Sequence, residues 1–115
     1  MRIGELAART GVSVRLLRYY EEQGLLQPER LPSGYRVYAE SDVDTVARVR
    51  VLLAAGLSTA TIAQVLPCVA GTDPVVPICP DMVAVLRRER ARIDTSIAAL
   101  EASRALLDDV IAAVP

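Results

Sequence analysis

The chain has 115 residues, 52% of them hydrophobic and only 3% aromatic, so it suits one ordinary domain, or one small domain plus an appendage, with an aliphatic core. Its 13 basic and 14 acidic residues leave a net charge of −1, and such a bulk charge does not by itself indicate a nucleic-acid-binding protein. With two cysteines and no histidine, it has few ligands for a soft metal ion and no histidine for general base catalysis.

No signal peptide is expected at the start of the chain. Its first stretch, RIGELAARTG, has no apolar segment of the kind found in a signal peptide, and no apolar run is long enough to span a membrane. We therefore expect a cytoplasmic protein without a membrane partner. Lasting structural disulfides are rare in that compartment.

Two short helices are predicted first. Ile3 and Leu6 are spaced for one helix face, and Gly11 suits the end of that helix. Ser13 is a typical N-cap for the next helix, VRLLRYYEEQ, which Gly24 closes. Two helices joined by so short a connection are typical of a helix-turn-helix.

The second helix carries a basic face. At about 100° per residue, Arg15, Arg18 and Tyr19 share one side, while Leu17 and Tyr20 lie toward the core. Guanidinium groups can contact phosphates or guanine edges, and a phenol can contact phosphate. This pattern predicts a recognition helix, although an ordinary solvated face carrying arginines would show the same spacing.

A small hairpin, or wing, is expected next. The segment LLQPERLPSGYRVY combines turn residues at Pro28 and in PSG with a β-prone YRVY. Arg36 lies beside Tyr35 at the tip of this hairpin. From there it can reach the DNA backbone or a minor groove.

Two more helices and a loop follow. Ser41 and Asp44 resemble a capping box for DVDTVARVRVLLAA, and Ser58 can cap TATIAQVL, which stops at Pro67. The next stretch, CVAGTDPVVPICP (residues 68–80), holds both cysteines and three prolines. We interpret it as a hinge loop.

From Asp81 to about Val114 the chain reads as one long helix with two apolar seams of seven-residue period. A helix this long cannot fold back on so small a domain, and it contains no turn for a helical hairpin, so we expect a coiled-coil homodimer. Arg90 and Arg104 interrupt one seam and can fix its register. The predicted dimer interface comprises Leu86, Ile93, Ile97, Leu100, Leu107 and Ile111.

The segments IGELAARTGVSVRLLRYYEEQGLL and PERLPSGYRVYAESDV resemble the winged-helix N-terminus of the MerR family of bacterial transcriptional regulators. The resemblance covers about residues 2–66, and the long helix falls where that family has its dimerisation helix. The expected fold is mainly α. It comprises a winged helix-turn-helix head at 1–67, a Cys/Pro hinge loop at 68–80 and an antiparallel coiled-coil dimerisation helix at 81–115.

The resemblance implies a homodimer that binds double-stranded promoter DNA, within a spacer longer than normal. Effector binding would let the dimer bend and undertwist this DNA, which realigns the promoter for RNA polymerase, an indirect partner. The family's backbone-contacting positions match Arg18, Tyr19 and Arg36, and its basic major-groove position matches Arg15. Its wing positions match Arg30 and Tyr35.

The two cysteines keep several possible roles. Cys79 matches the cysteine that the family's metal sensors place near the start of the long helix. In this family the other metal ligands, the iron–sulfur ligands and the ligand-binding domains all follow that helix. The sequence has no such segment after the helix, so a short member without a C-terminal effector domain is expected. Cys68 and Cys79 could be inert packing residues, a reversible disulfide, a site for a soft ion such as Cu(I), or part of a lid over a small organic effector.

An effector- or redox-responsive transcriptional regulator is the preferred function. The alternative is a coiled-coil interaction module, or an architectural DNA-binding factor without effector control. A thiol oxidoreductase is disfavoured because the sequence has no CxxC, no histidine and no Gly-rich phosphate loop. The protein is therefore not expected to be an enzyme.

Overall fold

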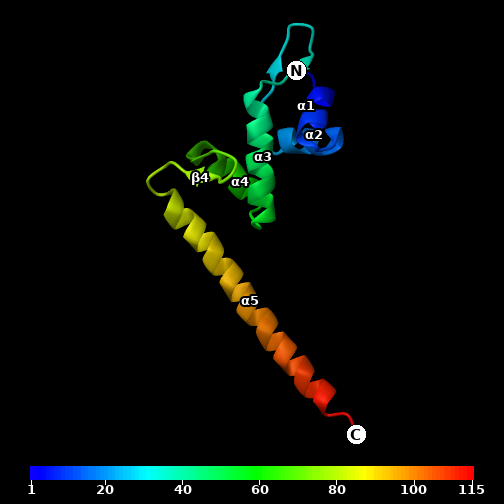
Figure 1. Cartoon of the computed structure of the whole chain (residues 1–115), viewed down its shortest axis with the longest axis vertical. Coiled ribbons are helices and arrows are strands. Elements are labelled where there is room, and N and C mark those ends of the chain that lie inside the picture. The colour runs from blue at the N-terminus through cyan, green and yellow to red at the C-terminus, as the bar shows by residue number, and fades with distance from the viewer. The chain divides into compact units, whose positions relative to one another are not determined.

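A computed structural model describes all residues from Met1 to Pro115 (Figure 1). The chain divides into two compact units, Met1–Cys79 and Pro80–Pro115, which we call the head and the long-helix unit. The head contains four α-helices, a short 3₁₀ helix and two small antiparallel hairpins, and the other unit is a single helix. The mainly helical fold expected from the sequence is confirmed.

The helix-turn-helix consists of α1 (Ile3–Thr10) and α2 (Val14–Glu22). Gly11 ends α1 in the left-handed conformation, with φ of 72°, which a glycine adopts without strain. The side chain of Ser13 caps α2 by accepting a hydrogen bond from the backbone N–H of Leu16 at 3.1 Å. Both helix boundaries therefore depend on the local signals visible in the sequence.

The wing is formed by β1 (Glu29–Arg30) and β2 (Arg36–Val37), which pair antiparallel. Arg30 lies directly opposite Arg36 in this register. Gly34 makes the turn with φ of 88°, a conformation that favours glycine. The predicted hairpin is therefore present, and it sets two arginines side by side.

The third helix, α3 (Ser41–Ala54), starts differently from the prediction. The predicted capping box of Ser41 and Asp44 does not form. Instead, the carboxylate of Asp42 accepts a hydrogen bond from the backbone N–H of Ala39 at 2.8 Å. The box is shifted by two residues because the chain is already helical at Ser41 and no longer needs a cap there.

The fourth helix, α4 (Thr59–Val65), is capped by Ser58 as predicted, with its side chain accepting from the backbone N–H of Thr61 at 3.1 Å. Together the helices enclose one core, which is aliphatic except for two buried tyrosines. The core residues of the head are Leu6, Val12, Leu17, Tyr20, Leu25, Leu26, Tyr38, Val46, Val49, Leu52, Leu57, Ile62, Val65 and Val69.

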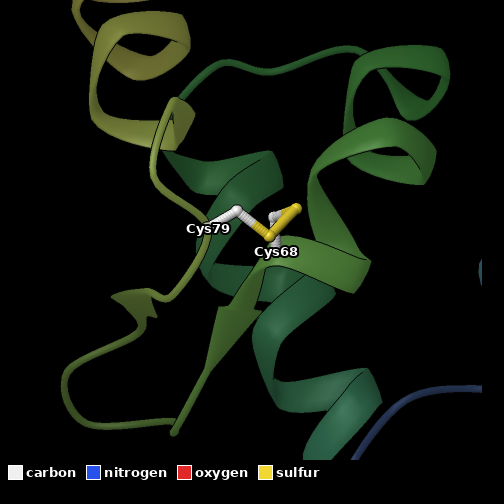
Figure 2. The surroundings of a disulfide bond; sticks show 2 residues. All are labelled: Cys68 and Cys79. Atoms are coloured by element: carbon white, nitrogen blue, oxygen red, sulfur yellow. A yellow bond between two sulfur atoms is a disulfide. The ribbon is translucent and has the colours of Figure 1, made fainter.

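Residues 68–79 form a second hairpin that the sequence did not predict. After the 3₁₀ helix Leu66–Cys68, β3 (Val69–Ala70) pairs antiparallel with β4 (Val76–Pro77). A disulfide joins Cys68 to Cys79 at the base of this hairpin (Figure 2). This segment belongs to the compact head, so a hinge at residues 68–80 remains a prediction about motion.

The long-helix unit consists of α5 (Met82–Ala112), an uninterrupted helix of 31 residues. It begins one residue after the predicted start at Asp81 and ends two residues before Val114. Almost all of its side chains are exposed. No helix in the structure combines the length and apolar character that crossing a membrane requires.

Candidate nucleic-acid interface

Helix α2 presents the basic face that its spacing predicts. Arg15, Arg18 and Tyr19 are exposed on α2, whereas Leu17 and Tyr20 are buried in the core. The two buried side chains fix the rotation of α2 about its axis, and this rotation turns the basic face outward. Burial raises the pKa of Tyr20, so its phenol stays neutral.

A notch of about 320 Å³ opens in the head beside this face. It lies where the N-terminal residues, α2 and the wing come together. Three guanidinium groups and two phenol rings line it, together with Ile3 and Gly34. These charged and aromatic residues are Arg2, Arg18, Tyr35, Arg36 and Tyr38.

Two side-chain contacts tie the wing to its neighbours in the head. The Nε of Arg36, on β2, lies 2.8 Å from Oε1 of Glu21, on α2. The guanidinium carbon of Arg2 lies 4.6 Å above the ring centroid of Tyr35, which is a cation–π contact. The wing is therefore held against both α2 and the start of the chain.

The hydroxyl of Tyr38 is buried at the notch without a hydrogen-bond partner. The side chain is only 1% exposed. Burial raises the pKa of Tyr38, and the negative charge of Glu21 raises it further, against the opposing effect of Arg36. The phenol is therefore a protonated, unused donor beside a group of cations.

The structure brings some predicted site residues together and leaves others apart. Arg18, Tyr35 and Arg36 line one notch, whereas Arg15, Tyr19 and Arg30 lie outside it. Sequence reasoning missed Arg2 and Tyr38, which also line the notch, and Glu21, which forms the ion pair with Arg36. Their proximity depends on contacts distant in sequence, such as the hydrogen bond of 2.6 Å from the Met1 ammonium to the carbonyl oxygen of Tyr38.

The two cysteines form a second candidate site in the head. The Cα atoms of Cys68 and Cys79 are 5.0 Å apart, and no free cysteine remains. Figure 2 shows Cys79 on the segment that follows β4, bonded to Cys68 at the end of the 3₁₀ helix. In this state neither sulfur is available to Cu(I), and no cluster of three or more potential metal ligands exists in the chain.

Residues 1–67 match the family described as MerR HTH family regulatory protein. Heavy metal-dependent transcription regulator 2 of Rhizobium meliloti strain 1021 is 34% identical over 102 residues, which are 88% of this chain and 67% of the relative. The regulator HmrR of Rhizobium leguminosarum bv. viciae is 31% identical over 111 residues, which are 96% of this chain and 84% of the relative. Nodulation protein NolA of Bradyrhizobium elkanii is 34% identical over 95% of this chain, which spans 46% of NolA.

Solved structures show the same fold. The N-terminal part of MtaN, the Bacillus subtilis multidrug transporter activator, superposes with a TM-score of 0.74 at 20% identity and covers 96% of this chain and 97% of its own. HiNmlR, a MerR family regulator that lacks the sensor domain and is bound to promoter DNA, gives a TM-score of 0.59 at 23% identity, over 96% and 86% of the two chains. At these identities the likeness concerns the fold alone.

Proposed function

The chain belongs to the MerR family, a family of transcriptional regulators rather than enzymes, and we propose that it acts as a homodimer that binds promoter DNA and distorts it. The observation that carries this proposal is the exposed basic face of α2 beside the cationic notch of the wing. Arg18 belongs to both, so the basic face and the notch adjoin on the head. A structural neighbour bound to promoter DNA supports the same assignment.

We assign the DNA contacts by chemistry. Arg15, on the exposed side of α2, reads base edges in the major groove, where a guanidinium can form two hydrogen bonds with guanine. Arg18 and Tyr19, on the same side, contact the phosphate backbone and set the orientation of the helix. The wing contacts to the backbone or minor groove come from Arg30, Tyr35 and Arg36.

The dimer forms through α5. Its apolar seam is open to solvent, with Leu100 71% and Leu107 62% exposed. An apolar stripe of this length, repeated every seven residues, is typical of a helix that pairs with another helix. A second copy of the chain supplies the partner in this proposal.

The charges along α5 favour antiparallel pairing. Residues 87–94 hold four arginines against two acidic residues, whereas residues 101–109 hold one arginine against three acidic residues. An antiparallel pair sets the basic part of one helix beside the acidic part of the other, and a parallel pair sets like charges together. Electrostatics therefore selects the antiparallel orientation, although each exposed pair contributes little.

DNA distortion follows from this arrangement. Two heads fixed at the ends of an antiparallel pair contact DNA at two half-sites, and bending or untwisting between them changes the promoter presented to RNA polymerase. The polymerase then responds to the shape of the promoter rather than to the regulator directly. Fluorescence energy transfer between dyes at the two ends of the bound duplex would measure the bend.

The DNA-binding proposal is tested by a gel shift and a footprint on the promoter region of the gene that encodes the chain. Arg18→Ala should weaken binding about tenfold and lower the slope of affinity against salt by about 0.9, because one phosphate contact is lost. Arg88→Ala, which removes an exposed arginine from the outer face of α5, is the matched control and should bind normally. A folded dimer that binds none of this DNA at low salt would contradict the proposal.

The Arg18→Ala variant also distinguishes a regulator from the alternative function, a coiled-coil interaction module. A coiled-coil interaction module would keep its dimer and its partner when Arg18 is lost, because its activity lies in α5. An architectural factor would bend DNA identically with and without oxidant or metal. A regulator should bind the promoter about tenfold more weakly in Arg18→Ala while it stays dimeric.

We also propose that the Cys68–Cys79 pair makes the regulator redox-responsive. The disulfide closes the β3–β4 hairpin and ties Cys79, the last residue of the head, to the end of the 3₁₀ helix. Oxidation therefore restrains the point where the chain leaves the head. After reduction, only the hydrogen bonds of the hairpin restrain it. A promoter-binding regulator works in the cytoplasm, where thiols are kept reduced, so the bond would form there only under oxidising conditions.

The switching step is a thiol–disulfide exchange. One cysteine thiolate attacks a low-molecular-weight disulfide, forms a mixed disulfide and releases one small thiol. The second cysteine then attacks the mixed disulfide, which forms the Cys68–Cys79 bond and releases the other small thiol. The protein loses two protons and two electrons, and the small disulfide is reduced to two thiols.

Mass spectrometry and the bend measurement together test this switch. Oxidised protein should weigh two hydrogens less than reduced protein and should bend the promoter to a different degree. Cys79→Ser should not show this difference in mass and promoter bend between oxidising and reducing conditions. A full response in Cys79→Ser would contradict the disulfide switch, and a full response in both Cys68→Ser and Cys79→Ser would contradict any thiol chemistry. A response of the reduced protein to Cu(I) but not to oxidant would replace the switch with a metal site.

A further inference from the structure

Tyr38 holds the only buried side-chain polar atom in the chain that lacks a hydrogen-bond partner. A buried hydroxyl without a partner is destabilising, so native proteins generally give it an acceptor. The Tyr38 side chain is part of the buried core, but its hydroxyl makes no hydrogen bond there. The hydroxyl is therefore a donor for which the folded head provides no acceptor.

The residues around Tyr38 indicate which kind of acceptor its hydroxyl could meet. Tyr38 lines the same notch as the guanidinium groups of Arg2, Arg18 and Arg36. Three cations around one unused donor favour an anionic oxygen over a neutral one. The notch, at about 320 Å³, has room for a phosphate group.

Glu21 fixes how Arg36 meets such a group. Its carboxylate forms an ion pair with the Nε of Arg36 at 2.8 Å. This leaves the two terminal amino groups of the guanidinium for another oxygen ligand. The Glu21 side chain is only 18% exposed, whereas that of Arg36 is 41% exposed. The ion pair therefore holds the inner edge of the guanidinium and leaves its outer edge free.

We propose that this notch binds one phosphate of the DNA backbone, with the Tyr38 hydroxyl donating to a phosphate oxygen and Glu21 positioning Arg36 for the same phosphate. This inference rests on the proposed DNA-binding function. It adds one direct contact, Tyr38, and one positioning residue, Glu21. Neither residue belongs to the exposed basic face of α2.

The chemistry of the notch is consistent with this role. The raised pKa of Tyr38, which burial causes, keeps the phenol protonated and able to donate. The negative charge of Glu21 would repel a phosphate if it stood alone, but its ion pair with Arg36 offsets that charge. The phosphate then meets a net positive site and satisfies the one unpaired donor.

Tyr38→Phe tests the direct contact because it removes only the hydroxyl. We expect affinity for the footprinted promoter duplex to fall about tenfold, as for loss of a hydrogen bond to a charged group. The salt slope should stay unchanged because the donor is neutral. The thermal midpoint of the free protein should stay the same or rise, because an unpaired buried hydroxyl is removed.

Tyr20→Phe is the matched control for this variant. Tyr20 is the other buried tyrosine of the head, and it does not line the notch. It should therefore keep normal affinity. Equal losses in Tyr20→Phe and Tyr38→Phe, or normal affinity in Tyr38→Phe, would overturn the phosphate contact.

Glu21→Ala tests the positioning role and has a neighbouring control. Removing a negative charge near DNA should strengthen binding, and we expect this sign for Glu22→Ala, since Glu22 is exposed and forms no ion pair. Glu21→Ala should instead weaken binding several-fold, because Arg36 is no longer held. The double variant with Arg36→Ala should bind no worse than Arg36→Ala alone.

Duplexes with a single neutral methylphosphonate locate the phosphate itself. Wild type should lose affinity at one position in each half-site, and Tyr38→Phe and Glu21→Ala should lose much less there. Equal losses in all three proteins would contradict the inference while the DNA-binding function stands. If the wild type binds no DNA, the function itself fails, and this inference fails with it.

Discussion

The head and the long-helix unit use apolar residues in opposite ways. In the head, each α-helix buries at least one apolar side chain in the shared core. In α5 the only buried residue is Met82, and the seam of Leu100 and Leu107 is open to solvent. Both regions have helical apolar spacing, so the spacing alone does not tell which of them can fold by itself.

The difference lies in where the partner for each apolar face comes from. The head supplies its own partners, because α3 contacts both α1 and α4 within one unit. A single helix cannot bury its own stripe, and most helical stability in proteins comes from packing. The head should therefore be stable as a monomer, and the order of α5 should depend on dimerisation.

The largest expected effect comes from charging the seam of α5. Leu100→Glu together with Leu107→Glu should raise the dimer dissociation constant by more than about 1,000-fold, because four carboxylates would enter one apolar interface. The head should remain folded. Sedimentation equilibrium measures the dissociation constant, and circular dichroism follows the helix content.

Ala102→Glu is the control for this variant, since Ala102 lies on the opposite side of α5 from Leu100. It should leave the dimer intact. A double variant that is still dimeric would show that the seam is not the interface and would remove the contrast between the two regions.

A cavity in the head should have the next largest effect. Ile62 is fully buried, so Ile62→Ala should lower the free energy of unfolding by about 2–5 kcal/mol. Leu106→Ala, on the exposed outer side of α5, should change it by less than about 0.5 kcal/mol. Urea unfolding at a fixed protein concentration measures both changes. Equal losses of unfolding free energy would mean that Leu106 is buried as deeply as Ile62.

Reduction of the disulfide should weaken the head alone. Closing an 11-residue separation restricts the unfolded chain, and its release should cost about 3 kcal/mol on the chain-entropy account. Thermal unfolding with and without reductant measures this difference. The double variant Cys68→Ser with Cys79→Ser should be insensitive to reductant, and a wild type equally insensitive would contradict the role of the bond.

The smallest expected effect concerns an exposed ion pair between α1 and the start of α3. The Arg9 guanidinium, hydrogen-bonded to Glu40, holds the pKa of that carboxyl below its usual range. The pair therefore stabilises the head above the usual glutamate pKa, and this contribution is lost as the pH falls through the lowered pKa of Glu40. Salt should weaken it as well, because both side chains are exposed.

Glu40→Gln should thus lower the thermal midpoint at neutral pH and have no effect in strong acid. Glu101→Gln, an exposed change on α5 without an ion pair, should have no effect at either pH. A Glu40→Gln effect that persists in acid would show that the carboxyl stabilises the head by something other than its charge.

Features with a local cause could be predicted from the sequence. Ser13 caps α2 through an atom three residues away, and the seven-residue repeat of α5 is visible without any tertiary contact. The predicted box at Ser41 was displaced because the chain enters α3 earlier, in contact with the preceding Ala39. A shift of this size depends on how the wing leads into the helix, which local pattern does not determine.

Features that need distant contacts were not predictable. The sequence left the roles of the two cysteines open, because only the folded β3–β4 hairpin brings their Cα atoms to 5.0 Å from each other. The notch required the start of the chain to reach Tyr38, a contact that no periodicity in the sequence records. Long-range hydrogen bonds and ion pairs thus determine the parts of the candidate site that sequence reasoning missed.

Gly71 has a consequence for how this protein can evolve. It lies in the disulfide-closed hairpin with φ of 74°, and a Cβ at this position would come 2.8 Å from the carbonyl oxygen of Pro74. No other residue fits there without moving the backbone that brings the two cysteines together. Lineages under selection for the thiol pair should therefore retain Gly71 with it, and drift at Gly71 should accompany loss of the cysteines.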